Sequence, residues 1–318
     1  MLKALHRFSE NEIQEYIFSD ALLNNIYCVL DQIIHCQQPK ITNFWVEGAL
    51  GSGRTYFLKY IYFCLNPETQ EEAFKRIIDS VKDLEKNDLA CSLYYTAADF
   101  TYLLNELKTY SFDLCLGPYP PGHEGIENFA ADVLSFYNAT LGFNPYNINF
   151  VRYVEKPLAR LVLLNEFKRA ICEAFECEYT HENICDIATN ETGEMIRLIN
   201  RIAPSIEISA DKIFQNCHIP EITEYIHREI DEHLRDKSEN HKVVFFIDMF
   251  APKTVDECIQ LQHLTSQLVY KFDNKVWFIF TSSREYSTTE CTTFMNKIKD
   301  HNSDSIKLFT QNPTPFEF

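Results

Sequence analysis

Basic runs, long apolar stretches and glycine are all scarce in this sequence, and the scarcities exclude several classes of protein. No apolar run approaches the roughly 20 residues that a membrane-spanning helix needs. The N-terminal segment turns acidic at Glu10 and has no small-residue cleavage site, so a secretory signal is not expected. With 46% hydrophobic and 14% aromatic residues among 318, however, the chain can bury a large core and is not disordered.

The charge balance is strongly acidic. Twenty-nine Lys and Arg residues stand against 46 Asp and Glu residues, a formal net charge of -17. This charge opposes non-specific binding to nucleic acid and to anionic membrane surfaces, and no run of Lys or Arg in the sequence indicates a local basic patch. Eleven cysteines, an odd number, lie mostly inside apolar segments and are expected to be buried thiols in a reducing cytoplasm.

Two common catalytic signatures are also missing. The chain contains neither H-E-x-x-H nor G-x-S-x-G, so metalloprotease and hydrolase functions have no support. Cys172, Cys177, His181 and Cys185 have a passing likeness to a zinc site, but they lack the short C-x2-C turn. If they lay on one continuous helix, these side chains would spread around its axis. A zinc site is therefore not expected.

Three of the eight glycines fall in one loop, Gly48–Thr55, between an apolar run at Phe44–Val46 and a helix-compatible run from Tyr56 to Cys64. A strand, a glycine-rich loop and a helix in this order are typical of the phosphate-binding loop G-x-x-x-x-G-K-[ST]. The pattern predicts a nucleotide site made of Gly48, Gly51, Ser52, Gly53, Arg54, Thr55 and Tyr56.

Arg54 departs from that motif, because it stands where the motif has Lys. Lysine is a compact point charge that reaches the β- and γ-phosphates, whereas arginine is a longer planar fork. We expect phosphate binding to survive and fast hydrolysis to be impaired. A glycine-rich turn without a ligand is the alternative.

A second motif candidate is Asp248, which closes the apolar segment Lys242–Phe250. In phosphate-loop proteins such a strand ends in an Asp that holds Mg²⁺ together with the loop Thr, here Thr55, and a Glu often follows. Met249 occupies that next position. Asp256 and Glu257 remain candidates for the missing carboxylate, and a simple role for Asp248 in capping the next loop also stays open.

A third buried segment, Lys275–Ser283, ends in hydroxyl residues. A polar side chain at such a strand tip commonly contacts the γ-phosphate, so Thr281 or Ser283 is a candidate sensor. The alternative is that these hydroxyls bond local backbone.

Strands are predicted near residues 43, 111, 243, 276 and 305, with helices between them. This alternation predicts an α/β fold, a doubly wound parallel sheet with a large helical insertion. The glycine-rich loop indicates that the sheet is of the P-loop NTPase kind. The predicted organisation is an N-terminal helical segment over 1–40 and an NTPase-like domain over 41–318, with the insertion at about 120–238. Helix caps are expected at Ser9, at Ser19-Asp20, and at Thr96 with Asp99.

One segment of the sequence, around the glycine-rich loop, is specific enough to suggest a protein family. Asn43–Gly48 followed by Gly51–Tyr60 resembles the FWV-G-x-x-GSGK-[ST]-HF-L-KYL block of the large P-loop ATPases of bacterial BREX phage-defence systems, the BrxC/PglY family. Gly142–Pro145 and Glu166–Lys168 are similar to that family's helical insertion, and Lys242–Met249 and Trp277–Ser283 fall where its metal-binding and sensor strands stand.

The resemblance implies an ATP-binding module of the AAA/STAND-like kind that acts in antiviral defence. Gly48, Gly51, Ser52, Gly53, Arg54 and Thr55 would surround phosphate, Thr55 and Asp248 would hold Mg²⁺, and Thr281 or Ser283 would be the sensor. ATP or ADP with Mg²⁺ is the implied cofactor, and other defence proteins or further copies of this chain are the implied partners. The chain is expected to be a shortened relative or a piece of a longer protein.

Three functional hypotheses follow. The first is a degenerate P-loop protein that binds nucleotide and serves as a subunit or regulator of a BREX-like defence assembly. The second is a nucleotide-free scaffold that binds other proteins, and the third is an active ATPase that uses Asp256 or Glu257.

Overall fold

The computed structural model of the chain describes most of its residues. They are residues 10–36, 43–47, 53–86, 92–116, 129–206, 208–214, 219–250, 252, 254–272, 274–282, 288–302 and 304–307. The chain divides into two compact units, which we call the sheet unit (Met1–Phe129 with His227–Phe318) and the helical unit (Ala130–Ile226).

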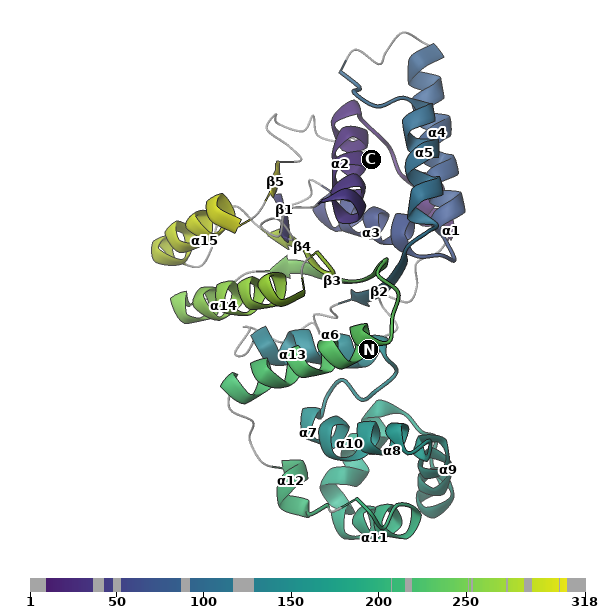
Figure 1. Cartoon of the computed structure of the whole chain (residues 1–318), viewed down its shortest axis with the longest axis vertical. Helices are drawn as coiled ribbons and strands as arrows, with labels where there is room; N and C mark the ends of the chain where they lie inside the picture. The colour runs from purple at the N-terminus through teal and green to yellow at the C-terminus, as the bar shows by residue number, and fades with distance from the viewer. Residues whose placement is uncertain are drawn as a thin grey trace. The chain divides into compact units, whose positions relative to one another are not determined.

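The sheet unit is an α/β structure built on one parallel sheet (Figure 1). All five strands predicted from the sequence are present: β1 Asn43–Glu47, β2 Ser111–Leu116, β3 His241–Phe250, β4 Val276–Ser282 and β5 Asp304–Lys307. They lie in the order β2-β3-β4-β1-β5, and each neighbouring pair is parallel. The strand that carries Asp248 is therefore separated from β1 by β4.

Two groups of helices cover the two faces of this sheet (Figure 1). On one face lie α2 Asp20–His35, α3 Arg54–Leu65, α4 Gln70–Lys86 and α5 Ala97–Leu107, with the short α1 Glu10–Glu15 against α4. On the other face lie α14 Val255–Phe272 and α15 Thr289–Asn302. The predicted double winding is thus present in this α/β sheet.

Alternation along the strands decides which side chain meets which layer. Trp277 and Ile279 of β4 belong to the core under α3, as do Val244 and Phe246 of β3. The intervening residues point to the opposite face, where the rings of Trp45 and Phe280 stack with centroids 4.3 Å apart. Nearly all the described side chains of β1, β3 and β4 are buried on both faces, which explains why these three strands read as apolar runs.

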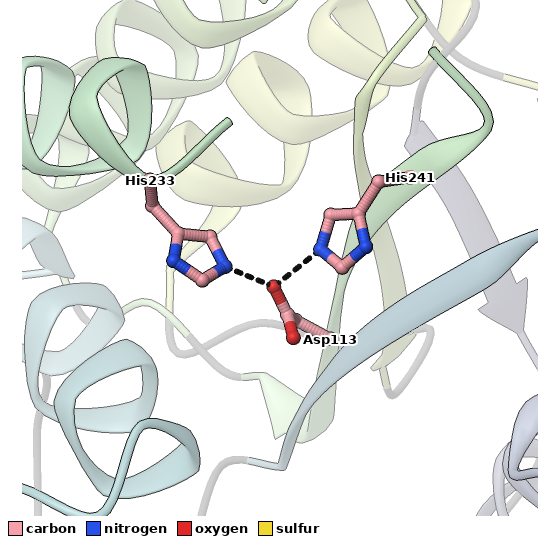
Figure 2. A group of neighbouring side chains, drawn as sticks. All are labelled: Asp113, His233 and His241. Carbon is pink, nitrogen blue, oxygen red and sulfur yellow. Dashed lines mark hydrogen bonds and ion pairs between the residues drawn. The ribbon is translucent and has the colours of Figure 1, made fainter. Parts of the chain in front are cut away.

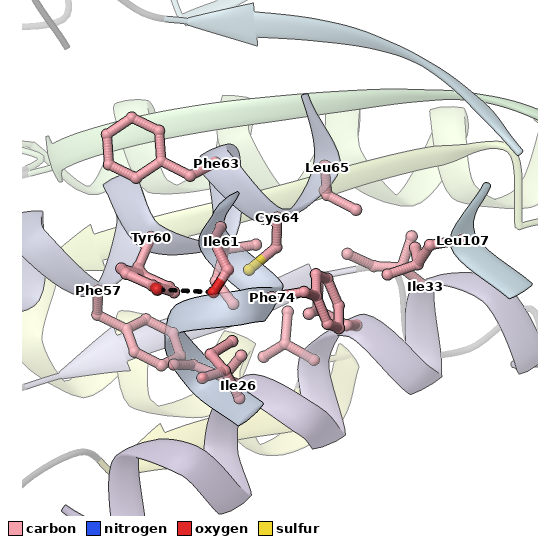
Figure 3. Close-up of a cluster of buried hydrophobic side chains, with 14 of the residues drawn as sticks. Ile26, Ile33, Phe57, Tyr60, Ile61, Phe63, Cys64, Leu65, Phe74 and Leu107 are labelled. Atoms are coloured by element: carbon pink, nitrogen blue, oxygen red, sulfur yellow. Dashed lines mark hydrogen bonds between the residues drawn. The ribbon is translucent and has the colours of Figure 1, made fainter. Parts of the chain in front are cut away.

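The core under α3 is aromatic and dense (Figure 3). Phe57, Tyr60, Ile61 and Cys64 of α3 have no exposed surface. The Tyr60 hydroxyl donates to the Ala73 carbonyl at 3.0 Å, so burial leaves this polar group satisfied. Burial of Phe57 and Ile61 contributes about 1.5–3 kcal/mol for each side chain, which holds α3 against the sheet.

Two of the predicted helix caps are present. Ser19 caps α2 by accepting a hydrogen bond from the Leu22 backbone N–H. Thr96 and Asp99 form a complete capping box at the start of α5. The third, at Ser9, lies outside the described residues. These polar side chains fix where the helices begin.

The described residues of the helical unit contain helices and no strand. Its core gathers around Phe150, Phe167 and Ile199. In chain order, the helical elements between β2 and β3 are α6 Phe129–Thr140, α7 Ile148–Phe150, a π-helical turn Val151–Glu155, α8 Lys156–Arg160, α9 Leu164–Phe175, α10 His181–Asn190, α11 Thr192–Ile202, α12 Ala210–Phe214 and α13 Ile219–Arg235. The division between the units falls within α13.

The four residues considered as a zinc site do not share one helix. Cys172 lies in α9, His181 and Cys185 lie in α10, and Cys177 lies between them. Glu176 closes α9 in the left-handed conformation (φ 49°), which turns the chain away from the helix axis.

Candidate functional site

The start of α3 forms one wall of the candidate site. Gly53 precedes the helix with φ 83°, a conformation that suits glycine, and its carbonyl accepts the first helical hydrogen bond, from Phe57, at 2.9 Å. The backbone N–H groups of a helix's first turn have no acceptor within the helix and carry partial positive charge. Of the other predicted loop residues, Gly48, Gly51 and Ser52 lie outside the described residues.

Three predicted residues meet at the carboxyl end of the sheet. The Thr55 hydroxyl lies 3.0 Å from both carboxylate oxygens of Asp248, and the Thr281 hydroxyl donates to Asp248 Oδ1 at 2.5 Å. Asp248 follows Val244 and Phe246 in alternation on β3, and Thr281 follows Trp277 and Ile279 on β4. Both side chains therefore lie on the face that α3 covers.

The strand order brings these three residues together. Because β4 lies between β1 and β3, its tip places Thr281 beside the acidic residue of β3. Thr281 is 1% exposed, whereas Asp248 is only partly buried. The Asp248 carboxylate is thus held by two hydroxyl groups and still has solvent-accessible surface.

Arg54 is directed toward the tip of β4. Its side chain is only 8% exposed, and its Nη1 donates to the backbone carbonyl of Ser282. Ser282 was not among the residues predicted from the sequence, although it adjoins the predicted Ser283. Its own hydroxyl is buried and has no hydrogen-bond partner among the described residues. Arg54 thus joins the first turn of α3 to the sheet.

The remaining candidates lie at different places. Tyr56 is 58% exposed on α3. Asp256 is exposed and Glu257 is buried in the first turn of α14, where the Glu257 backbone N–H donates to the Thr254 hydroxyl. The backbone of Met249 continues β3 beyond Asp248. Ser283 lies outside the described residues.

A second polar group, which no sequence pattern predicted, lies at the amino end of the sheet. Within the described residues, the one group of His, Cys, Asp and Glu side chains placed to share a metal ion is Asp113, His233 and His241. Two signals were available: an acidic residue interrupts the apolar residues of β2, and a histidine stands two residues before the apolar run of β3. Burial would raise the pKa of Asp113, but the hydrogen bonds and charges of the two imidazoles hold it below its usual range.

Comparison of the sequence with protein-family models and with curated proteins finds no match. Among the described residues, no helix is both long and apolar enough to cross a membrane.

Proposed function

We propose that the carboxyl end of the sheet binds Mg²⁺ with ATP or ADP. The convergence of Thr55, Asp248 and Thr281 carries this proposal. These residues are far apart in sequence, and each was assigned a nucleotide-related role from local pattern alone. A capping role for Asp248 would not need hydroxyls from two other elements.

The residues fit the chemistry of the complex. Mg²⁺ binds oxygen ligands and is commonly held by one or two protein side chains with substrate phosphates and water, so Asp248 and Thr55 would hold it. The N–H groups of the first turn of α3 would receive phosphate oxygens, and Gly53 allows the chain to turn into the helix there. A bound Mg²⁺ would neutralise phosphate charge.

We further propose that hydrolysis is weak or absent. Arg54 is engaged with the Ser282 carbonyl, so reaching a phosphate would require breaking a buried hydrogen bond. Met249 supplies no carboxylate to polarise water. Binding without rapid turnover suits a protein whose nucleotide acts as a structural or regulatory ligand.

The biological setting we propose is a BREX-like phage-defence assembly, with this chain as a subunit or regulator. The support is the likeness of Asn43–Tyr60 to the loop block of those ATPases. Partners would be other defence proteins or a second copy of the chain. A chain that remains monomeric with Mg²⁺-ATP and recovers no partner from its host would contradict this part.

Two alternatives retain specific support. A nucleotide-free scaffold is favoured by Arg54, whose side chain already has a protein partner. An active ATPase is favoured by Glu257, a buried carboxylate in the helix that follows β3. A Glu257→Gln variant with unchanged turnover would count against the latter.

Calorimetric titration with ATP and ADP, with and without Mg²⁺, tests the proposed site. The variants are Arg54→Lys and Arg54→Ala, with Arg76→Ala as the matched control, because Arg76 contacts the Tyr16 carbonyl and the Ser80 hydroxyl instead. We expect the wild type, Arg54→Lys and Arg76→Ala to bind and Arg54→Ala to bind more weakly. No binding by the folded wild type at millimolar nucleotide would overturn the proposal and favour the scaffold.

A further inference from the structure

The side chains of Asp113, His233 and His241 point toward one another (Figure 2). The group lies at the amino end of the sheet, whereas the proposed nucleotide site lies at the carboxyl end. Asp113 comes from β2, His241 begins β3, and His233 lies in the last turn of α13. The Nε2 atoms of both histidines lie 2.6 Å from the same atom, Asp113 Oδ2. All three residues belong to the sheet unit, so the group is formed within one compact body.

The register of two strands fixes half of this group. Ser111 of β2 pairs with His241 of β3, and Asp113 is two residues farther along β2 on the same face. The His241 ring therefore lies between the two side chains, with Nδ1 2.7 Å from the Ser111 hydroxyl and Nε2 at the Asp113 carboxylate. The five residues between α13 and β3 bring His233 to the same carboxylate.

We propose that Asp113, His233 and His241 bind a divalent transition-metal ion, for which Zn²⁺ is the best match. Two imidazole nitrogens and one carboxylate oxygen form a donor set used by zinc and other first-row metals, whereas Mg²⁺ and Ca²⁺ prefer oxygen alone. Three protein ligands leave a fourth position for water or a substrate atom.

The surroundings of the group favour a cation. The Ser111 hydroxyl at Nδ1 orients the His241 ring and leaves Nε2 for the metal, as second ligand-shell groups do in zinc sites. His233 lies at the carboxyl end of α13, where the partial negative charge of a helix attracts cations. Side-chain exposures of 19% for His233 and 18% for Asp113 allow an ion to enter from solvent.

The three ligand atoms need to move apart only slightly to hold a metal ion. The three ligand atoms lie within 4.8 Å of one another. In a tetrahedral zinc site with bonds near 2.1 Å, ligand atoms are about 3.4 Å apart. Metal binding must therefore lengthen the two 2.6 Å contacts between the histidine Nε2 atoms and Asp113 Oδ2 by under about 1 Å. The metal ion would also displace the protons that form these two hydrogen bonds. Rotation of the partly buried His233 side chain, which lies at a helix end, can supply this movement.

Titration of the metal-stripped full chain with Co²⁺, followed by competition with Zn²⁺, tests the site. Visible absorption reports Co²⁺ coordination geometry, and calorimetry reports stoichiometry. We expect one ion per chain and a rise in melting temperature with Zn²⁺. Affinity should fall by at least about tenfold in His233→Gln and Asp113→Asn, and by about tenfold in Ser111→Ala. Circular dichroism and melting curves verify that each variant is folded.

The matched control is His35→Gln. His35 is also a partly exposed histidine beside carboxylates, contacting Asp31 and Glu106, but its group has a single imidazole. Its loss should leave metal affinity unchanged. Absence of stoichiometric binding, equal affinity in folded His233→Gln, or a spectrum dominated by thiolate bands from the cysteines would each overturn the proposal. Each of those results would leave Asp113, His233 and His241 as a hydrogen-bonded structural group.

Discussion

The two ends of the parallel sheet carry opposite kinds of polar group. At the carboxyl end, Asp248 is surrounded by hydroxyls from Thr55 and Thr281, an oxygen-only set on the face that α3 covers. At the amino end, Asp113 is surrounded by the imidazoles of His233 and His241, and these side chains lie on the opposite face. One carboxylate therefore forms the centre of each group, and its partners decide the chemistry.

Chain direction explains much of this difference. In a parallel sheet the helix that follows a strand starts at the carboxyl end, so the positive N-terminus of α3 lies beside Asp248. The helix that precedes β3 finishes at the amino end, so the negative C-terminus of α13 lies beside Asp113. Anionic phosphates with a hard metal suit the first end, and a softer cation suits the second.

The largest expected effect is a loss of ligand affinity at one end of the sheet that leaves binding at the other end unchanged. Asp248→Asn removes the charge proposed to hold Mg²⁺, so we expect Mg²⁺-nucleotide affinity to fall by at least about 100-fold, roughly 2.7 kcal/mol. Co²⁺ affinity at the amino end should be unchanged. Calorimetry with each ligand measures both.

The reciprocal variant, His241→Gln, is the control. It should lose Co²⁺ binding and retain nucleotide binding, because its side chain is on the other end and face of the sheet. If either variant lost both nucleotide binding and Co²⁺ binding with its fold intact, the two sites would not be independent.

Removing one hydroxyl at the carboxyl end gives the next largest effect. Thr281→Val keeps the side-chain volume but deletes the hydrogen bond to Asp248, so nucleotide affinity should fall about tenfold, close to 1.4 kcal/mol. Thr265→Val is matched, because Thr265 is 3% exposed and its hydroxyl donates to the Leu261 carbonyl within α14. Equal nucleotide affinity in both variants would show that Thr281 has no part in the site.

The sequence predicted the carboxyl-end group and missed the amino-end group for a physical reason. A glycine-rich loop, Thr55 and a strand-ending Asp248 are local patterns with a known chemical use. Asp113, His233 and His241 belong to no such pattern, since the group exists only when β2 pairs with β3 in one register. Likewise, the strands were readable from apolar runs, whereas the contact of Arg54 with Ser282 joins residues 228 positions apart and had no local signal.

Replacing Gly53 at the start of α3 is expected to lower the free energy of unfolding by an amount between the effects described above and below. Gly53→Ala places a β-carbon at φ 83°, where there is open space but the conformation is unfavourable, so the free energy of unfolding should fall by about 1–2 kcal/mol. Gly193→Ala is the control with the opposite sign: it lies exposed in α11, also in open space, and alanine should stabilise that helix by up to about 1 kcal/mol. Urea unfolding measures both changes.

The smallest effect concerns His35, where two carboxylates surround one imidazole instead of the reverse. Partial burial lowers its pKa, but the hydrogen bonds and charges of Asp31 and Glu106 outweigh that effect, so the pKa is raised above 6.5. A raised pKa means that the folded state binds the proton more tightly. The resulting stabilisation is complete below pH 6.5 and disappears as pH rises through the folded-state pKa.

Replacing His35 with Gln should therefore cost a few tenths of a kcal/mol, at most about 1, at pH 5.5 and almost nothing at pH 8.5, because exposed ion pairs are weak. Urea unfolding of both proteins at the two pH values measures this difference, and added salt should shrink it at the lower pH. A cost that does not change with pH would mean that the imidazole contributes by packing alone. Added Zn²⁺ should leave the difference unchanged, because one imidazole beside two carboxylates lacks the second nitrogen ligand that the amino-end group supplies.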